Sequence, residues 1–347
     1  MSVFEKNPRL TLAAFWFLLV VLACGLAEIT LRFIVPYDIG YYTAIKKPGV
    51  YEYPYGTIHI NQDGYPDTEF DRSSPKKKIG YFGDSVTFGV GAGEEYRFSN
   101  LLEKNYPAFE HWTFSMIANG IEDDLIVRTA REYGLSRVIY ALNLNDIMPV
   151  TAPDDTPETP SNPETPVLRV VQQWIWDHLD ATLRGHSYLY TSVRTLLKNA
   201  LLKIGYSHTG FVAAELFPQQ NRDLVLETAT RITQIGHILK KQGIQFCVLI
   251  LPYEMQISRD AAQTYRDLDI DWEDGFETGS TQKILKQGLK GVALYDGMTA
   301  FSDVTESAQT GEFFVYNKGD KIDFNHPNRA GHARLAAGMI ASRFCGF

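Results

Sequence analysis

Ser85 occupies the turn that follows a short apolar run. The tripeptide Gly83-Asp84-Ser85 comes directly after residues 79–82, which read Ile-Gly-Tyr-Phe. A serine at a strand-to-helix turn holds its hydroxyl outward and leaves its backbone amide available to an anion. These residue types predict a nucleophile at Ser85, although a solvated helix cap could use the same tripeptide.

A second polar block lies near the C-terminus, where residues 323–328 read Asp-Phe-Asn-His-Pro-Asn. A spacing of three residues lets the Asp323 carboxylate bind Nδ1-H of His326, which fixes the tautomer and leaves Nε2 to take a proton. The pair is typical of a general base and the residue that orients it. Alternatively, Asp323 caps the helix that starts near Asn328, and His326 is an ordinary loop histidine. His332 is expected to pack on a helix face.

Two further residues could complete an oxyanion hole. Asn145 ends the third apolar run and offers a side-chain N-H, and Gly120 follows the second run and offers a backbone N-H. With the Ser85 amide they would supply three donors to a developing oxyanion. The simpler alternative is that Asn145 and Gly120 only form turns.

Short apolar runs alternate with segments of helical periodicity, which predicts an α/β fold with a parallel sheet. Such a sheet binds ligands at the carboxyl ends of its strands, where Ser85 and Asn145 both fall. The expected strands are residues 79–82, 112–117, 138–144, 246–251 and 292–295. The expected helices are residues 99–105, 123–132, 222–242, 281–289 and 329–344.

These blocks, in this order, resemble the SGNH hydrolase superfamily, also called GDSL-type esterases, over residues 78–345. The segment Asn61-Gln62-Asp63-Gly64-Tyr65 is similar to the neck of membrane-anchored members. The resemblance implies a flavodoxin-like three-layer α/β/α sandwich without a metal or other cofactor. It also implies Ser85 as nucleophile, His326 as base and Asp323 as orienting residue, with oxyanion donors at Ser85, Gly120 and Asn145.

Two blocks depart from the pattern of that superfamily. Asn143 stands where relatives usually have glycine, and Ser115 and Ile117 replace the usual Asn-x-Gly of the second block. Asparagine tolerates a positive φ better than most residues, so Asn143 need not break the turn. Ile117 adds bulk near the rim, and these changes bear on the shape of the oxyanion pocket.

The N-terminus contains 18 consecutive uncharged residues, from Leu10 to Ala27. At about 1.5 Å per residue, a helix of this length nearly spans a bilayer core. We expect a membrane anchor over residues 10–35 that Pro36 ends, with Glu28 and Arg32 paired at the headgroups. A lipoprotein signal at Cys24 and a cleaved signal peptide remain alternatives. The short basic tail, residues 1–9, favours a cytoplasmic N-terminus and an exported domain.

The remaining segments flank or interrupt the predicted sheet. Residues 36–77 are expected to form an extended neck with a short hairpin around residues 57–64. An insertion over residues 149–220 begins with six prolines in residues 149–166, as in a solvated linker. Amphipathic helices follow over residues 167–179 and 190–201 and could cover the sheet, form a lid or face a membrane or partner. Trp174 and Trp176 are candidates for a sugar or lipid surface.

The composition excludes several functions. A formal net charge of −8 without a basic stripe argues against nucleic-acid binding. Three cysteines, without CxxC or Cys/His spacing, imply neither a disulfide framework nor a zinc site. The first expected strand is not followed by a phosphate-binding glycine motif, which argues against a nucleotide-binding protein.

These features together predict residues 78–347 to be a membrane-anchored, extracytoplasmic (periplasmic, if bacterial) serine esterase or acyltransferase. The resemblance implies O-acyl groups, often O-acetyl, of a cell-envelope glycan as substrate. The alternative is a non-catalytic subunit of a membrane protein complex that uses the hydrolase fold, with a partner bound through the N-terminal helix or residues 149–204. The altered second and third blocks and the size of the insertion motivate this alternative.

Overall fold

The computed structural model describes residues 8–34, 47–53, 55–115, 123–147, 183, 187–203, 214–268, 270–316 and 323–347. Two compact units make up the chain, and each is described by itself: Met1–Thr43 with Thr159–His208, and Ala44–Glu158 with Thr209–Phe347. Several predicted features lie outside the described residues: most of the basic tail, Pro36, Ile117, Gly120, the proline-rich linker, the helix over 167–179, Trp174 and Trp176.

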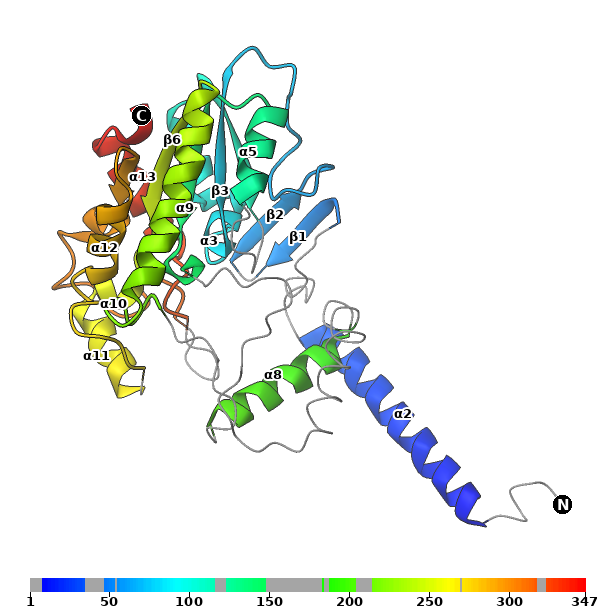
Figure 1. The fold of residues 1–347 in the computed structure, drawn as a ribbon. Helices are drawn as coiled ribbons and strands as arrows, with labels where there is room; N and C mark the ends of the chain where they lie inside the picture. The colour runs from blue at the N-terminus through cyan, green and yellow to red at the C-terminus, as the bar shows by residue number, and fades with distance from the viewer. Residues whose placement is uncertain are drawn as a thin grey trace. The chain divides into compact units, whose positions relative to one another are not determined.

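The larger unit contains a five-stranded parallel sheet, of which β3 and β6 are labelled in Figure 1. Its strand order is β4-β3-β5-β6-β7. All five predicted strands are confirmed, with shifts of a few residues at their ends. Their bounds are β3 Lys77–Gly83, β4 Phe109–Ser115, β5 Arg137–Leu142, β6 Gln245–Ile250 and β7 Ala293–Asp296.

Helices cover both faces of the sheet because its strands present apolar side chains on both sides. In β5, Val138, Tyr140 and Leu142 belong to one buried cluster and Ile139 and Ala141 to the other, as the two-residue period of a strand requires. The first cluster includes side chains from α5 Asp123–Glu132, α9 Arg222–Lys241 and α12 Ser280–Gly288. The second includes side chains from α4 Phe98–Asn105 and α13 Arg329–Ala341. The predicted three-layer α/β/α arrangement is therefore confirmed.

The strand order places a reversal point between β3 and β5. The chain passes from β3 to β4 on one side and then returns to β5 on the other side of β3. In open α/β sheets, ligands bind at the carboxyl ends of the strands at such a reversal. Short elements follow three of these ends: α3 Ser85–Phe88, η3 Leu144–Asp146 and η5 Gly297–Phe301. The remaining short elements of this unit are η2 Glu94–Tyr96, α10 Glu254–Ile257, α11 Arg259–Asp267 and η6 Phe344–Gly346.

The segment that precedes β3 contains a hairpin, as predicted, at a shifted position. An antiparallel hairpin forms from β1 Gly49–Tyr53 and β2 Gly56–Ile60, earlier than the predicted residues 57–64 and overlapping them only in β2. After β2, Tyr65 and Phe70 pack on the apolar cluster that includes Trp112 and Phe114. Only a few side chains of the hairpin are buried, so buried and exposed residues alternate weakly along its strands. The predicted position was therefore shifted from the observed one.

A disulfide joins Cys247 of β6 to Cys345 of η6, across 98 residues of sequence, with 6.0 Å between the Cα atoms. Both cysteines are buried in the core. The bond fixes the C-terminal segment to β6, an inner strand of the sheet. Three cysteines without regular spacing gave no indication of this pairing.

The smaller unit contains two described helices, α2 Pro8–Ile34 and α8 Tyr188–Lys203. Thr11–Ile34 of α2, 24 residues, is long and apolar enough to cross a membrane. The predicted pair is present, with Arg32 Nη2 at 2.8 Å from Glu28 Oε1. The second of the two predicted amphipathic helices corresponds to α8.

Candidate active site

The turn after β3 holds Ser85 at the first position of α3. The side chain of Asp84 caps this short helix by accepting a hydrogen bond of 3.0 Å from the amide of Val86. At the other end Gly89, with φ of 105°, closes the helix in the left-handed conformation. Because Ser85 begins the helix, its own amide has no acceptor within the helix and is available to an anion.

Two glycines allow the backbone to pack closely around this turn. A Cβ on Gly83 would lie 2.1 Å from Oγ1 of Thr87, so the turn from strand to helix has no room for a side chain. A Cβ on Gly91 would lie 2.5 Å from the carbonyl oxygen of Pro327, the residue after His326. The second of these approaches brings the turn that holds Ser85, the nucleophile turn, against the loop that carries His326, the histidine loop.

Ser85, His326 and Asp323 form a continuous hydrogen-bonded chain, although His326 lies 241 positions after Ser85 in the sequence. Oγ of Ser85 lies 2.8 Å from Nε2 of His326, and Nδ1 of His326 lies 2.9 Å from each carboxylate oxygen of Asp323. This is the geometry in which a histidine can take the proton of a serine hydroxyl while a carboxylate holds its ring. The predicted alternative for Asp323 does not hold, because Asn328 caps α13 instead.

The loop that carries His326 is fixed from both sides. The carbonyl of His326 accepts a hydrogen bond of 2.8 Å from the amide of Val315, and Phe313 accepts one of 2.9 Å from the amide of Asn328. The side chain of Asn328 accepts from the amides of Ala330 and Gly331 in the first turn of α13. The ring of His326 therefore extends from a backbone that the neighbouring segment holds in place.

The environment of His326 favours its protonated form. Burial alone lowers the pKa of this histidine, but the charge of Asp323, its hydrogen bond and the charge of Asp84 outweigh burial, so the pKa is raised above 6.5. Below the raised pKa the ring is protonated and cannot accept a proton from Ser85. The site thus requires a pH above that value for a general base to act.

Glu254 supports the histidine loop. Its side chain accepts a hydrogen bond from the hydroxyl of Tyr265 and another from the amide of Gly311, and its amide donates to the carbonyl of Phe324 at 2.8 Å. Burial raises the pKa of Glu254, with the two hydrogen bonds opposing this rise. No local motif in the sequence marks Glu254, since its partners lie 11 to 70 residues away.

The third block, residues 143–146 after β5, lies beside the nucleophile turn because β5 pairs with β3. Asn143 donates from Nδ2 to the Asp84 carboxylate at 2.8 Å, and its own amide donates to Asp146 at 3.2 Å. Asn143 has a φ of −79°, so the departure from glycine introduces no left-handed residue here. The substituted residue instead links the third block to the cap of α3.

Asn145 lies in η3, directly after the carboxyl end of β5, and is half-buried. The buried side chain of Tyr253, which follows β6, lies near Asn145 and Glu215. Burial raises the pKa of Glu215 to about 7. The third predicted oxyanion donor, Gly120, lies outside the described residues.

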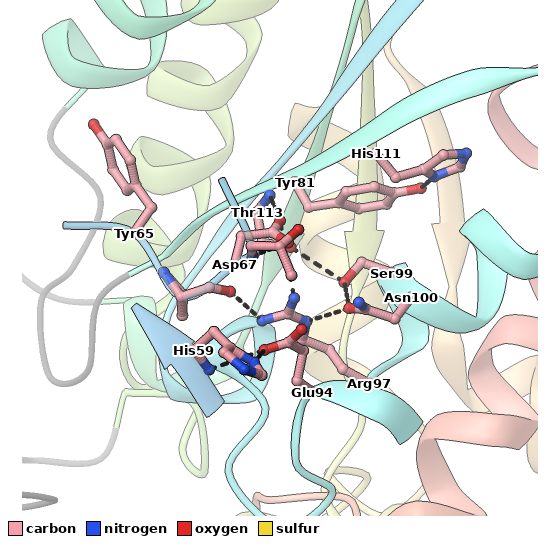
Figure 2. Close-up of polar contacts among 12 residues, drawn as sticks. His59, Tyr65, Asp67, Tyr81, Glu94, Arg97, Ser99, Asn100, His111 and Thr113 are labelled. Carbon is pink, nitrogen blue, oxygen red and sulfur yellow. Dashed lines mark hydrogen bonds and ion pairs between the residues drawn. The ribbon is translucent and has the colours of Figure 1, made fainter. Parts of the chain in front are cut away.

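Arg97 and Asp67 form a buried ion pair (Figure 2). Nη2 of Arg97 is 4.0 Å from Oδ2 of Asp67, and Nη1 donates to the carbonyls of Pro66 and Phe88. Asp67 also accepts a hydrogen bond of 2.7 Å from the amide of Thr113 in β4. Phe88 is the last residue of α3, so Arg97 connects the segment after the hairpin to the helix that begins with Ser85.

Burial dominates the acid-base behaviour of this pair. It raises the pKa of Asp67 to about 7, against the opposing charge of Arg97 and the hydrogen bond from Thr113. His332 lies nearby, accepts a hydrogen bond of 3.3 Å from the amide of Phe98 and stacks on the Phe98 ring. Burial lowers the pKa of His332 to about 3, so this histidine is a neutral core residue, as expected.

Within the described ranges, no three His, Cys, Asp or Glu side chains are grouped in a way that could hold a metal ion. The arrangement of Ser85, His326 and Asp323 is suited to nucleophilic attack on a carbonyl carbon. A parallel α/β sheet with a Ser-His-Asp chain at the carboxyl ends of its strands defines the class of serine hydrolases.

No family model matches the chain, and no curated protein matches it either. Among solved structures, the chain is similar to the esterase EstA from Pseudoalteromonas sp., at 13% identity and a TM-score of 0.34, over 77% of this chain and 96% of that one. It is also similar to TesA, at 13% identity and a TM-score of 0.35, over 77% and 98%. A G-D-S-L family protein from Desulfitobacterium hafniense DCB-2 matches at 12% identity and a TM-score of 0.34, over 77% and 99%. Because these identities and TM-scores are low, the function of the chain has to be inferred from the geometry of its site.

Proposed function

We propose that this chain is a membrane-anchored, extracytoplasmic serine esterase or acyltransferase of the SGNH type. Its substrate class would be O-acyl groups, such as O-acetyl, on a cell-envelope glycan or a related ester. The observation that carries the proposal is the distance of 2.8 Å between Oγ of Ser85 and Nε2 of His326, with Asp323 on the far side of the ring.

In the first half of the reaction, Oγ of Ser85 attacks the ester carbonyl carbon while Nε2 of His326 takes the hydroxyl proton. Asp323 stabilises the imidazolium that results and keeps its own charge. When the tetrahedral intermediate collapses, the bond to the leaving alcohol breaks and His326 returns the proton to that oxygen. The products of this half are an acyl-serine and a free hydroxyl group.

The second half repeats these steps with a different nucleophile. His326 takes a proton from water or from a sugar hydroxyl, whose oxygen attacks the acyl-serine carbonyl carbon. Collapse releases Ser85, which recovers its proton from His326. With water the product is a carboxylic acid, and with a sugar it is a new ester.

The oxyanion of both intermediates requires donors near Ser85. The Ser85 amide is suited to this role because α3 does not use it. We assign the other two donors to the side chain of Asn145 and the backbone of Gly120. The bond between Asn143 and Asp84 supports this assignment by fixing the third block against the nucleophile turn.

Three features support an anchored, exported enzyme. The apolar segment Thr11–Ile34 has the length of a membrane span. The buried disulfide between Cys247 and Cys345 favours an oxidising compartment, since such bonds are rare in the cytosol. Lys6 and Arg9 before the apolar run favour a cytoplasmic N-terminus.

The test is labelling of the purified full-length chain in detergent with a fluorophosphonate probe, which reacts with an activated serine. We expect labelling of the wild type and none of Ser85→Ala or His326→Ala. Ser136→Ala is the matched control, because Ser136 lies at the amino end of β5 and its hydroxyl only donates to the carbonyl of Lys78. It should label as the wild type does.

A folded wild-type chain that does not label would contradict the esterase proposal. It would favour the alternative, a non-catalytic subunit that binds a membrane protein partner through α2 or residues 149–204. For a chain that does label, the products from an O-acetylated glycan distinguish the two reactions. Hydrolysis releases acetate, and transfer moves the acetyl group to a second glycan.

A further inference from the structure

Glu28 near the end of α2 holds the first turn of α8. Its Oε2 accepts hydrogen bonds from the hydroxyl of Ser187 at 2.9 Å and from the amide of Leu189 at 2.8 Å. Its Oε1 accepts from the amide of Tyr188 at 3.1 Å. A carboxylate from one helix thus caps the N-terminus of another, where unpaired amides and the helix dipole favour a negative charge.

Arg32 completes this junction. Its Nε donates to Oε1 of Glu28 at 2.9 Å, and its guanidinium lies over the ring of Tyr188, 5.2 Å from the centroid. Glu28 and Ser187 are 159 positions apart in sequence, so the junction joins two distant segments of the chain. Both helices belong to the same compact unit.

The junction lies at the end of the uncharged run of α2. Glu28 is the first charged residue after the uncharged run from Leu10 to Ala27. A charged residue at this position of a membrane helix belongs at the headgroup level. If α2 spans the membrane, α8 therefore begins at the membrane-water boundary.

The composition of α8 suits that boundary. Helical periodicity places Leu189, Val193 and Leu196 on one face, and Val193 and Leu196 are 53% and 61% exposed. The helix contains three basic residues and no acidic residue, in a chain whose net charge is −8. An exposed apolar face on a basic helix is typical of helices that lie in an anionic membrane surface.

We propose that α8 lies in the lipid headgroup region, with its apolar face on the acyl chains, and that Glu28 fixes it there as a cap supplied by the membrane helix. This inference goes beyond the proposed catalytic function and does not depend on it. It depends on α2 as a membrane span.

The test uses the full-length chain in vesicles of neutral and anionic phospholipid, with Cys24→Ser in the background so that the engineered thiol is the reactive one. An environment-sensitive fluorophore is attached at Val193→Cys or, as the matched control, at Ser192→Cys. These adjacent positions point about 100° apart around the helix. Quenching by lipids with a spin label near the headgroup is then measured.

We expect quenching at position 193 to exceed that at position 192 by about threefold, and to be stronger in anionic vesicles. In a Glu28→Ala background, the difference between the two positions should fall. Equal quenching at both positions would overturn the proposal. So would protection of position 193 from an aqueous quencher without quenching by lipid, which would mean that protein, from this chain or a second copy, covers the face.

A separate measurement tests α2 itself. Resistance of the vesicle-bound chain to extraction at alkaline pH supports the membrane span, and full extraction overturns both the span and the position of α8. Neither result depends on Ser85, so fluorophosphonate labelling distinguishes a failure of the catalytic proposal from a failure of this one.

Discussion

Asp323 contacts His326 through both carboxylate oxygens and so limits the rotation of the ring. The same contact raises the pKa of His326, since a negative charge beside the ring stabilises the imidazolium. The two effects have opposite consequences for a base. The ring is well placed and its proton affinity is high, but it is available only when the pH is high enough to remove the first proton.

Replacement of Asp323 should separate these effects. In Asp323→Asn, we expect kcat/KM to fall by about 10²- to 10⁴-fold, because the amide cannot hold the same tautomer. The acidic limb of the pH profile, which lies above pH 6.5 in the wild type because the pKa of His326 is raised, should move to lower pH. A pH-rate profile of ester hydrolysis checks both effects, and an unmoved limb would contradict the assignment of His326 as the base.

Asn145 and Asn143 offer a matched pair two residues apart. Asn145→Ala should lower kcat by about 10²- to 10³-fold with little change in Tm, as expected for loss of an oxyanion donor. Asn143→Ala should lower the free energy of unfolding by about 1–3 kcal/mol, because it leaves the buried Asp84 carboxylate without this donor. Thermal unfolding and steady-state kinetics of both variants check this, and equal loss of stability in the two would contradict the distinction.

At the scale of elements, long-range contacts fix the position of α3. The ion pair of Asp67 and Arg97 connects β4, through Thr113, to the last residue of α3, through Phe88. Both side chains are buried, so a substitution that removes one charge leaves the other without its counterion in a poorly solvated place. The nucleophile turn therefore depends on a segment that the sequence analysis treated as a neck.

Asp67→Ala should lower the free energy of unfolding by about 3 kcal/mol at alkaline pH, where Asp67 is ionised and the buried Arg97 loses its counterion. Asp63→Ala is the control: Asp63 pairs with Arg72 at 2.9 Å on the surface, where such pairs contribute about 0–1 kcal/mol. Denaturant unfolding of both variants checks this. A loss at position 67 no greater than at position 63 would show that the buried pair does not stabilise the fold.

The pKa of Asp67 also gives a pH dependence. Because burial raises this pKa from 3.8 to about 7, the native state holds a proton that the unfolded chain has released in this interval. The contribution of this bound proton to stability is therefore complete below about pH 4 and declines as the pH rises to about 7. The decline should be absent from Asp67→Asn when the unfolding free energy is measured across this interval, and its persistence there would assign it to another group.

The sequence predicted those features that local patterns specify. Apolar runs located all five strands, and a spacing of three residues located Asp323 and His326. Contacts between distant segments left no such pattern, since many partners would be equally compatible with the sequence. The bond of Cys247 to Cys345 and the cap that Glu28 gives to α8 belong to this group. The hairpin was misplaced because few of its side chains are buried.

For the whole molecule, the disulfide connects the stability of the fold with the compartment in which it forms. It closes a loop of 98 residues between β6 and η6, which in the chain-entropy model stabilises a fold by about 4.7 kcal/mol. In a reducing compartment this contribution would be absent. The redox state of Cys247 and Cys345 in the cell therefore reports on export, independently of any substrate.

Counting of thiols in cells tests the location and the fate of the N-terminus together. A retained anchor with an exported domain should leave one thiol, Cys24, open to a mass tag in denatured, unreduced samples, and three after reduction. A lipidated Cys24, or cleavage beyond it, should give none before reduction and two after, and the mass of the mature N-terminus separates these two cases. Three tags before reduction would contradict export, because both core cysteines would then be reduced. Cys24→Ser, with none before reduction and two after, calibrates the count.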